Sequence, residues 1–335
     1  MKCCEACFLD SELRFIVDKD SSETGNCRIC GSKNTKLLDA SKLWDKFDSV
    51  CSIYEPSEEG QRLVNWLIKD WQVFQLDEAR AQQLLVEILD DGERARHLFK
   101  PSALCLTDRL DTWNRLRAEL LTENRFFPST ELDEVRFALL LENLTMKPEE
   151  IPQEWYRARI EEEGPIPKDK MGAPPAKKAA AGRANPAGIP YLYVGSTRET
   201  AITEVRPHPG ETLSIAEFNL NVELQLIDLR DPRKLITPFK AESIEEIAGL
   251  RGDIDFLERL GAELTTPVLP NAASVDYIPS QYLCEFIKKS GKDGVVYASS
   301  VSKGVNLALF DPSLADPGKV SRVKVGKVAV EFESI

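Results

Sequence analysis

Apolar residues recur at intervals of three and four positions in several stretches between residues 41 and 146. In the first stretch, Leu63, Trp66 and Leu67 follow this spacing, which places apolar side chains on one face of a helix. The pattern predicts helices over residues 62–74, 77–89, 108–121 and 131–144, with prolines in the gaps between some of them. We therefore expect a helical bundle over residues 41–147, in which the aromatic residues serve packing.

From residue 153 onward the pattern changes to short apolar runs, several of them alternating with polar residues. These runs predict strands at residues 155–160, 191–194, 213–218, 223–228, 294–297, 306–310 and 322–332. Helices are predicted over 244–260 and from about residues 199 and 280, with Ser196 or Thr197 as the N-cap of the one near 199. Short strands mixed with few helices favour an α+β fold over a doubly wound sheet.

The segment 148–152, which carries a proline at each end, predicts a hinge. It divides the chain into an N-terminal segment over residues 1–40, a helical domain over 41–147 and a third domain over 153–335. The length of 335 residues, with 42% hydrophobic and 29% charged residues, is typical of a globular protein with a sizeable core. No apolar run approaches the ~18 residues of a membrane helix, and the first residues lack a signal-peptide pattern, so a cytoplasmic protein without membrane contact is expected.

Charge and histidine content exclude several function classes. The net charge of -12 argues against broad nucleic-acid binding, because phosphate contacts need a positive surface. The two histidines, His97 and His208, argue against a Ser-His-Asp triad and exclude a multi-histidine metal site. Neither histidine follows an arginine at the spacing of an HEPN-type RNase. The usual glycine-rich phosphate loops are also missing from the sequence.

Paired cysteines mark the N-terminal segment. Cys4 and Cys7 form one C-x-x-C pair, and Cys27 and Cys30 form a second, with Cys3 as an alternate ligand. Four thiolates at this spacing predict a tetrahedral, structural Zn²⁺ site over residues 1–40. Free thiols and disulfides are the alternatives, and a cytosolic setting disfavours disulfides.

Candidate chemistry lies in the third domain. Arg183 follows a glycine in a loop rich in proline and glycine, Tyr193 belongs to a predicted strand, and Glu204 stands among apolar residues on the predicted helix near 199. A half-buried carboxylate needs a partner or a chemical role. On the strand at 155–160, Arg157 and Arg159 share one face by alternation. The loop at 164–190 is locally basic, which suits a flexible surface loop or a cover over an anionic ligand.

From about residue 155 to residue 310 these motifs, in this order, resemble the RES domain, a family named for an Arg, a Glu and a Ser. The matching text is YRAR at 156–159, GRAN at 182–185, LY at 192–193, TA at 200–201 with Glu204, and GVVYASS at 294–300. The N-terminal part, with its cysteine pairs and helices, resembles the zinc-bearing helical region that accompanies some longer RES proteins.

The resemblance implies an ADP-ribosyltransferase-like β-core domain, preceded by a small zinc knuckle and an α-helical domain, that consumes NAD+. It implies Arg157, Glu204 and Ser299 as catalytic residues and Arg183, Tyr193 and Arg159 as NAD+-binding residues. Arg159 could take the place of Arg157, and Ser300 that of Ser299. Many RES proteins are toxins of bacterial toxin–antitoxin pairs, which implies an antitoxin or another protein partner bound through the helical domain, or a homo-oligomer.

The residue types fit this chemistry. An arginine fork can grip the pyrophosphate of NAD+, and an aromatic ring can stack on nicotinamide. A carboxylate stabilises the positive charge that develops on ribose as nicotinamide leaves, and a serine hydroxyl can bond ribose or the carboxamide. We expect an NAD+ glycohydrolase or phosphorylase. The alternatives are an ADP-ribosyltransferase acting on a macromolecule and a non-enzymatic partner-binding module, and the acceptor stays open among water, phosphate and a macromolecule.

Overall fold

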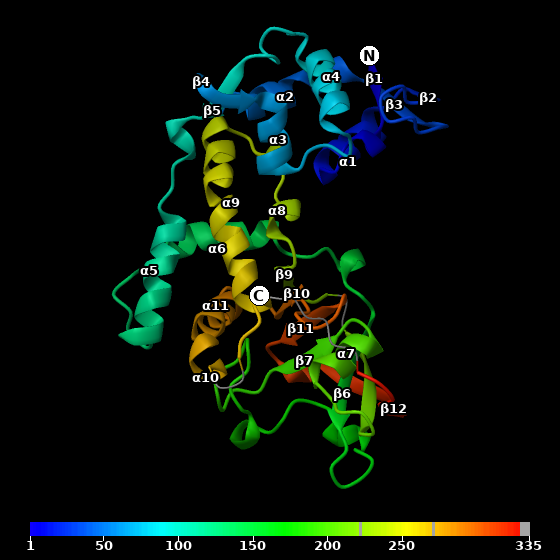
Figure 1. Ribbon diagram of the computed structural model, residues 1–335, viewed down its shortest axis with the longest axis vertical. Helices are drawn as coiled ribbons and strands as arrows, with labels where there is room; N and C mark the ends of the chain where they lie inside the picture. The colour runs from blue at the N-terminus through cyan, green and yellow to red at the C-terminus, as the bar shows by residue number, and fades with distance from the viewer. Residues whose placement is uncertain (221–222, 270–271, 329–335) are drawn as a thin grey trace. The chain divides into compact units, whose positions relative to one another are not determined.

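A computed structural model describes residues 1–220, 223–269 and 272–328 (Figure 1). The chain divides into two compact units, each built from two pieces of the sequence. Unit 1 comprises Met1–Leu110 and Pro232–Glu258, and unit 2 comprises Asp111–Asp231 and Arg259–Ile335. This is a division by compactness. The functional division at residues 1–40, 41–147 and 153–335 stays a prediction.

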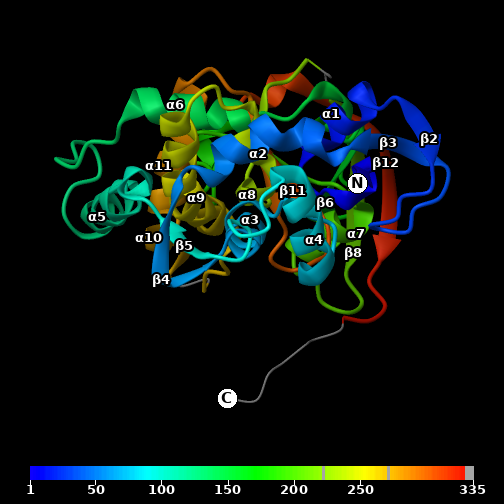
Figure 2. The same cartoon turned by 90° about the horizontal axis from the view of Figure 1, so that it is seen from above.

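A small antiparallel sheet and a helix form the N-terminal part of unit 1. The strands are β1 (Lys2–Cys3), β2 (Glu23–Gly25) and β3 (Thr35–Asp39), in the order β1-β3-β2, and β2 and β3 lie side by side in Figure 2. Helix α1 (Ser11–Asp20) begins after Asp10, whose carboxylate accepts a hydrogen bond from the Leu13 amide at 2.9 Å. Leu13 and Val17, four positions apart, are the buried residues of α1, so one stripe of this polar helix joins the core.

The rest of unit 1 contains most of the predicted helical segment. Its helices are α2 (Trp44–Cys51), α3 (Leu63–Trp71), α4 (Glu78–Leu89), α8 (Pro232–Leu235) and the first part of α9 (Ile244–Thr265). Helices α3 and α4 confirm the predictions at 62–74 and 77–89. Helix α3 ends earlier than predicted because Gln72 adopts a left-handed conformation with φ of 49°. Asp77 caps α4 by accepting a hydrogen bond from the Arg80 amide.

Residues 41–147 hold two strands in addition to the predicted helices. An antiparallel pair of strands, β4 (Tyr54–Arg62) and β5 (Leu98–Pro101), lies within this segment, and the two run side by side in Figure 1. Strand β4 is largely polar and its register with β5 shifts between Pro56 and Gln61. It therefore lacks the apolar alternation by which a strand is recognised in a sequence.

Unit 2 is built on one mixed sheet. Its strands are β6 (Glu154–Ile160), β7 (Leu192–Gly195), β8 (Thr212–Leu220), β9 (Leu226–Asp228), β10 (Gly294–Ala298), β11 (Val305–Leu309) and β12 (Ala315–Lys324). The order is β12-β8-β6-β7-β11-β10-β9, with β9 and β10 parallel and the other neighbours antiparallel. The helices are most of α5 (Arg109–Thr122), α6 (Glu134–Asn143), α7 (Arg198–Glu204), the end of α9, α10 (Ala273–Asp276) and α11 (Ile278–Lys289). This arrangement confirms the predicted α+β fold.

The last predicted strand is displaced. Residues 322–332 were expected to form it, but β12 begins at Ala315 and ends at Lys324. Strand β12 pairs with β8 from Ala315, opposite Leu220, to Lys324, opposite Thr212, with a register shift between Pro317 and Val320. One residue further, Val325 still exchanges backbone hydrogen bonds with Gly210 and Glu211. Residues 329–332 of the predicted strand lie outside the described residues. None of the helices in the described residues combines the length and apolar character that a bilayer crossing requires.

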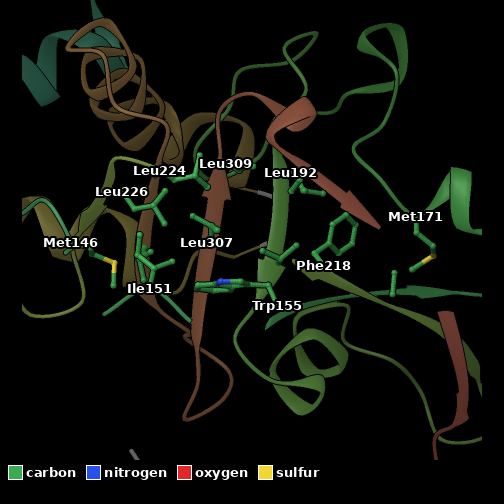
Figure 3. Close-up of a cluster of buried hydrophobic side chains, with 14 residues drawn as sticks. Met146, Ile151, Trp155, Met171, Leu192, Phe218, Leu224, Leu226, Leu307 and Leu309 are labelled. Atoms are coloured by element: carbon green, nitrogen blue, oxygen red, sulfur yellow. The ribbon is translucent and has the colours of Figure 1, made fainter. Parts of the chain in front are cut away.

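The main core of unit 2 covers one face of this sheet (Figure 3). Trp155 of β6 and Phe218 of β8 are fully buried there beside Leu192, Leu307 and other aliphatic side chains. Burial of side chains of this size contributes about 1.5–3 kcal/mol each to stability. A smaller cluster includes Ala158 of β6 and Ala201 of α7. Because Trp155 and Ala158 are an odd number of positions apart on β6, the two clusters lie on opposite faces of the sheet.

Candidate active site and cysteine cluster

A cavity of about 280 Å³ opens in unit 2 beside α7 and the middle strands of the sheet. It is lined by Tyr156, Arg157, Ala158, Tyr193, Val194, Gly195, Ala201, Glu204, Val205, Tyr297 and Asn306. Three of the predicted site residues are therefore brought together here: Arg157, Tyr193 and Glu204.

The cavity lies where β6 and β7 separate. Within the described residues these neighbours pair at a single position, Tyr156 with Gly195. Just beyond it, the guanidinium of Arg157 donates from Nη1 to the Tyr193 carbonyl oxygen at 2.8 Å, while its buried Nε has no partner among the described residues. Burial, and secondarily the charge of Arg159, lowers the pKa of Arg157 to about 10. The side chain thus stays cationic at neutral pH with a donor still to be satisfied.

Helix α7 brings Glu204 to this cavity. The helix starts after Thr197, whose hydroxyl accepts a hydrogen bond from the Thr200 amide at 3.0 Å, so the predicted cap is confirmed. Close approach of the helix to β7 depends on Gly195, where a Cβ would meet the Ala201 amide nitrogen at 2.9 Å. Ala201 and Glu204 both line the cavity, as expected for residues three apart on one helix face.

The carboxylate of Glu204 is held by two donors. Ser299 donates from Oγ to Oε1 at 2.7 Å, and Asn306 donates from Nδ2 to the same oxygen at 2.6 Å. Ser299 itself accepts hydrogen bonds from the amides of Val301 and Ser302, at 3.2 and 3.1 Å. The expectation that Glu204 is half-buried is wrong, since the residue is exposed, and its partners are polar groups of the loop after β10 and of β11.

Tyr193 lines the cavity, and its hydroxyl bonds the loop before β7. The hydroxyl donates to Asn185 Oδ1 at 2.6 Å and accepts from the Ala184 amide at 3.0 Å. Burial raises the pKa of Tyr193, so this hydroxyl stays protonated. Tyr193 therefore fixes the loop at 182–189 against β7.

This loop packs too closely for a side chain at Gly182, and we expect Gly182→Ala to destabilise the protein by about 1–3 kcal/mol. A Cβ there would meet the Tyr193 hydroxyl at 2.6 Å and also overlap Asn185 Oδ1. Thermal unfolding measures the effect. Gly172→Ala is the matched control, because a Cβ at Gly172 meets nothing within 4 Å. Equal unfolding temperatures for the two variants would contradict the packing argument.

The structure does not bring the other predicted binding residues to the cavity wall. Arg183 donates from Nη1 to the Thr266 carbonyl at 2.7 Å and lies over the Tyr277 ring at 5.2 Å. Arg159 is exposed and donates to the Lys170 carbonyl at 2.7 Å. Among the described residues, neither arginine lines the cavity, and no hydrogen bond of the Ser300 side chain is found, so their roles stay predictions.

Asn306 and Tyr297 line the cavity, although the sequence analysis gave neither of them a role. Asn306 and Tyr297 face each other as a cross-strand pair of β11 and β10, and both are buried. A signal was available: Asn306 is the polar residue of an otherwise apolar strand, and a buried amide needs hydrogen-bond partners. Its partner on α7 could not be found without the strand order, because about a hundred residues separate the two.

The predicted metal ligands gather at the other candidate site, in unit 1. The sulfur atoms of Cys4, Cys7, Cys27 and Cys30 all lie within 4.8 Å of one another, with Cys4–Cys30 at 3.4 Å and Cys7–Cys27 at 3.6 Å. Zn–S bonds of about 2.3 Å in a tetrahedron place sulfurs roughly 3.8 Å apart, so the donor set fits Zn²⁺. Cys3, the expected alternate, lies outside this group and points its thiol to the Leu38 carbonyl.

Comparison with known proteins places the candidate active site within a recognised domain. A family model described as "RES domain" matches residues 154–328, slightly more than half of the chain. This confirms the resemblance stated from the motifs. A chain in the crystal structure of the M. tuberculosis MbcT-MbcA toxin-antitoxin complex is 13% identical, with a TM-score of 0.32, over 55% of this chain and 92% of that chain. No curated protein matches the sequence.

Proposed function

We propose that this chain, which belongs to the RES domain family, is an enzyme that consumes NAD+ by cleaving the bond between nicotinamide and ribose. One observation carries the proposal. The arginine, glutamate and serine of the RES motif come from separate parts of the chain, yet Arg157 and Glu204 line one cavity and Ser299 bonds the Glu204 carboxylate. Such convergence of a cation, an anion and an aromatic ring in a cleft is typical of a ligand site.

Arg157 supplies the grip on the anionic part of the substrate. Its Nη1 is occupied by the Tyr193 carbonyl, and its buried Nε lacks a partner among the described residues. The guanidinium lines the cavity, and an N–H group of it other than the buried Nε would donate a charge-assisted hydrogen bond to a phosphate oxygen of NAD+. The Tyr193 ring is the candidate surface for nicotinamide, whose positive charge favours an aromatic face.

Glu204 supplies the negative charge at the reacting carbon. As neutral nicotinamide leaves with the electron pair of the glycosidic bond, positive charge develops on the ribose. A carboxylate preorganised by two donors stabilises that charge without reorganising during the reaction. The acceptor then forms a bond to the ribose carbon that nicotinamide left. When water is the acceptor, it loses a proton to the solvent and the product is ADP-ribose.

Incubation of the purified chain with NAD+, followed by measurement of released nicotinamide, tests the proposal. Parallel reactions with phosphate and with cell extract supply the other acceptors. Release with water alone identifies a glycohydrolase, and release that requires phosphate or extract identifies a phosphorylase or an ADP-ribosyltransferase. Absence of release under all three conditions would refute NAD+ consumption.

The choice between the two arginines of β6 gives a prediction. Arg157→Lys should lower kcat/KM for NAD+ at least about tenfold, because the three N–H donors of lysine sit on one nitrogen and cannot span the Tyr193 carbonyl and a phosphate as the planar guanidinium fork can. Arg159→Lys is the control on the same strand, and its exposed side chain should be replaceable with little loss. Nicotinamide release at several NAD+ concentrations measures both. A larger loss of kcat/KM in Arg159→Lys would show that Arg159 is the arginine of the RES motif that binds NAD+.

For the cysteine cluster we propose one structural Zn²⁺. Four thiolates fill a tetrahedral site and leave no open position for substrate, so the ion would stabilise the fold of the N-terminal segment and take no part in the reaction.

A further inference from the structure

The two oxygens of the Glu204 carboxylate stand in different surroundings. Oε1 accepts both hydrogen bonds, from Ser299 and from Asn306. For Oε2, no hydrogen-bond partner is found within residues 1–220, 223–269 and 272–328. A carboxylate held by one oxygen keeps the other free for a ligand in the cavity that Glu204 lines.

Ser299 has no capacity left for a ligand in this arrangement. A serine hydroxyl offers one hydrogen and two lone pairs. Its hydrogen goes to Glu204, and it accepts from the Val301 and Ser302 amides. The hydroxyl is thus saturated within the protein, and its partners are a loop and the end of a short helix.

Asn306 is anchored more firmly than Ser299. It lies in β11 between two hydrogen-bonded neighbours, opposite Tyr297 of β10 on one side and Gly195 of β7 on the other. Only 7% of its surface is exposed. Because a carboxylate only accepts, the amide must turn its Nδ2 toward Glu204, so the contact also fixes the orientation of the amide.

We propose that Asn306 is a positioning residue for the Glu204 carboxylate: it ties Oε1 to the rigid middle of the sheet and thereby directs Oε2 at the substrate. This inference rests on the proposed function for its catalytic meaning. The contact itself is a separate matter and can be tested without substrate.

The decisive variant is Asn306→Asp, which keeps the shape and replaces the donor with a second carboxylate. Two carboxylates at this distance hold one proton between them to higher pH. The rising limb of the pH–activity profile should move upward by about one to two pH units. At pH 7, kcat should fall about 10- to 100-fold, with KM little changed, because the carboxylate is no longer held for the transition state.

The other titratable groups that line the cavity are Tyr156 and Arg157 of β6, Tyr193 of β7 and Tyr297 of β10. All of them are unchanged in this variant, so a shift of the limb reports the new carboxylate. Asn114→Asp, on the exposed face of α5, is the matched control and should leave the profile in place.

A measurement of stability against pH, the stability arm of the test, separates this inference from the proposed function because it needs no substrate. The shared proton is bound more tightly in the folded state than in the unfolded state, so Asn306→Asp should lose stability relative to wild type as pH rises from about 4 through the pH at which the pair gives up its proton. Adding Glu204→Gln restores one amide and one carboxylate and should abolish that pH-dependent loss. Thermal unfolding between pH 5 and 8 measures all three proteins.

An unshifted activity limb in a folded Asn306→Asp variant, or a loss of stability that Glu204→Gln does not relieve, would overturn the inference. If the wild type releases no nicotinamide, the proposed function fails and the stability arm alone decides whether Asn306 holds Glu204. If Asn306→Asp does not fold, Asn306→Ala takes its place: a fall in kcat with KM retained supports positioning, and unchanged kcat refutes it.

Discussion

Glu204→Gln should lower kcat for NAD+ cleavage by about 10²–10³-fold while the protein stays folded. The substitution is nearly isosteric, and the glutamine Oε1 can still accept hydrogen bonds from Ser299 and Asn306. The substitution removes the negative charge of Glu204 at the cavity wall, where Oε2 has no hydrogen-bond partner among the described residues. The loss should therefore fall on the chemical step and leave NAD+ binding by Arg157 in place.

Nicotinamide release and NAD+ binding, measured separately on the same variant, check this prediction. Glu199→Gln is the matched control: Glu199 lies on the same helix, is exposed and is not among the residues that line the cavity. Consumption of NAD+ in a cell should depress growth, so expression of the protein should slow growth and Glu204→Gln should relieve the effect. Full activity in a folded Glu204→Gln protein would remove Glu204 from the mechanism.

The second large effect concerns the cysteine cluster. Removal of Zn²⁺, or Cys27→Ser, should loosen the N-terminal segment, because structural zinc contributes roughly 10–16 kcal/mol to the folding of small zinc-binding peptides. The small sheet of this segment is short, and its contact with the rest of unit 1 includes the Phe8 ring beside Phe74, with centroids 6.0 Å apart. Such contacts hold the segment in place only while the cysteine knuckles are folded.

Elemental analysis should find one zinc per chain, and limited proteolysis should cut Cys27→Ser faster near its N-terminus. Cys3→Ser is the control, since Cys3 is buried beside the cluster but is not part of it. NAD+ cleavage should persist at least in part, because the residues that line the cavity all belong to unit 2. Protein purified without metal, or an unchanged digestion pattern, would rule out the zinc assignment. Complete loss of cleavage in a folded variant would mean that the two sites are coupled.

Much of this protein was readable from local sequence. Strong helical periodicity found α3 and α4, and the Thr197 cap after the β7 run found α7, because such signals depend on neighbours within a few residues. The spacing of the two cysteine pairs was enough to predict that the four cysteines form a cluster. The order of the RES motifs predicted that Arg157 and Glu204 belong to one site, because a family motif relates residues far apart in the chain and a local periodicity does not.

Local pattern failed where the decisive contacts are long-range. Strand β4 is polar and gains its pairing only from β5, so no alternation revealed it. The contacts of Arg183 with the Thr266 carbonyl and the Tyr277 ring are likewise long-range and could not be read from the sequence, and its role in binding NAD+ stays a prediction.

The cavity itself belongs to the tertiary structure. It exists because β6 and β7 separate after one pair, and the pairing of β11 with β7 and β10 sets Asn306 against a helix about a hundred residues earlier in the chain. The sequence by itself determined which side chains of Arg, Glu and Ser were available and which short elements would carry them. Strand order and register decided which of these side chains meet, and they also placed Asn306 and Tyr297 at the cavity. The reason is that the partners of a buried polar side chain are the groups that the sheet places opposite it.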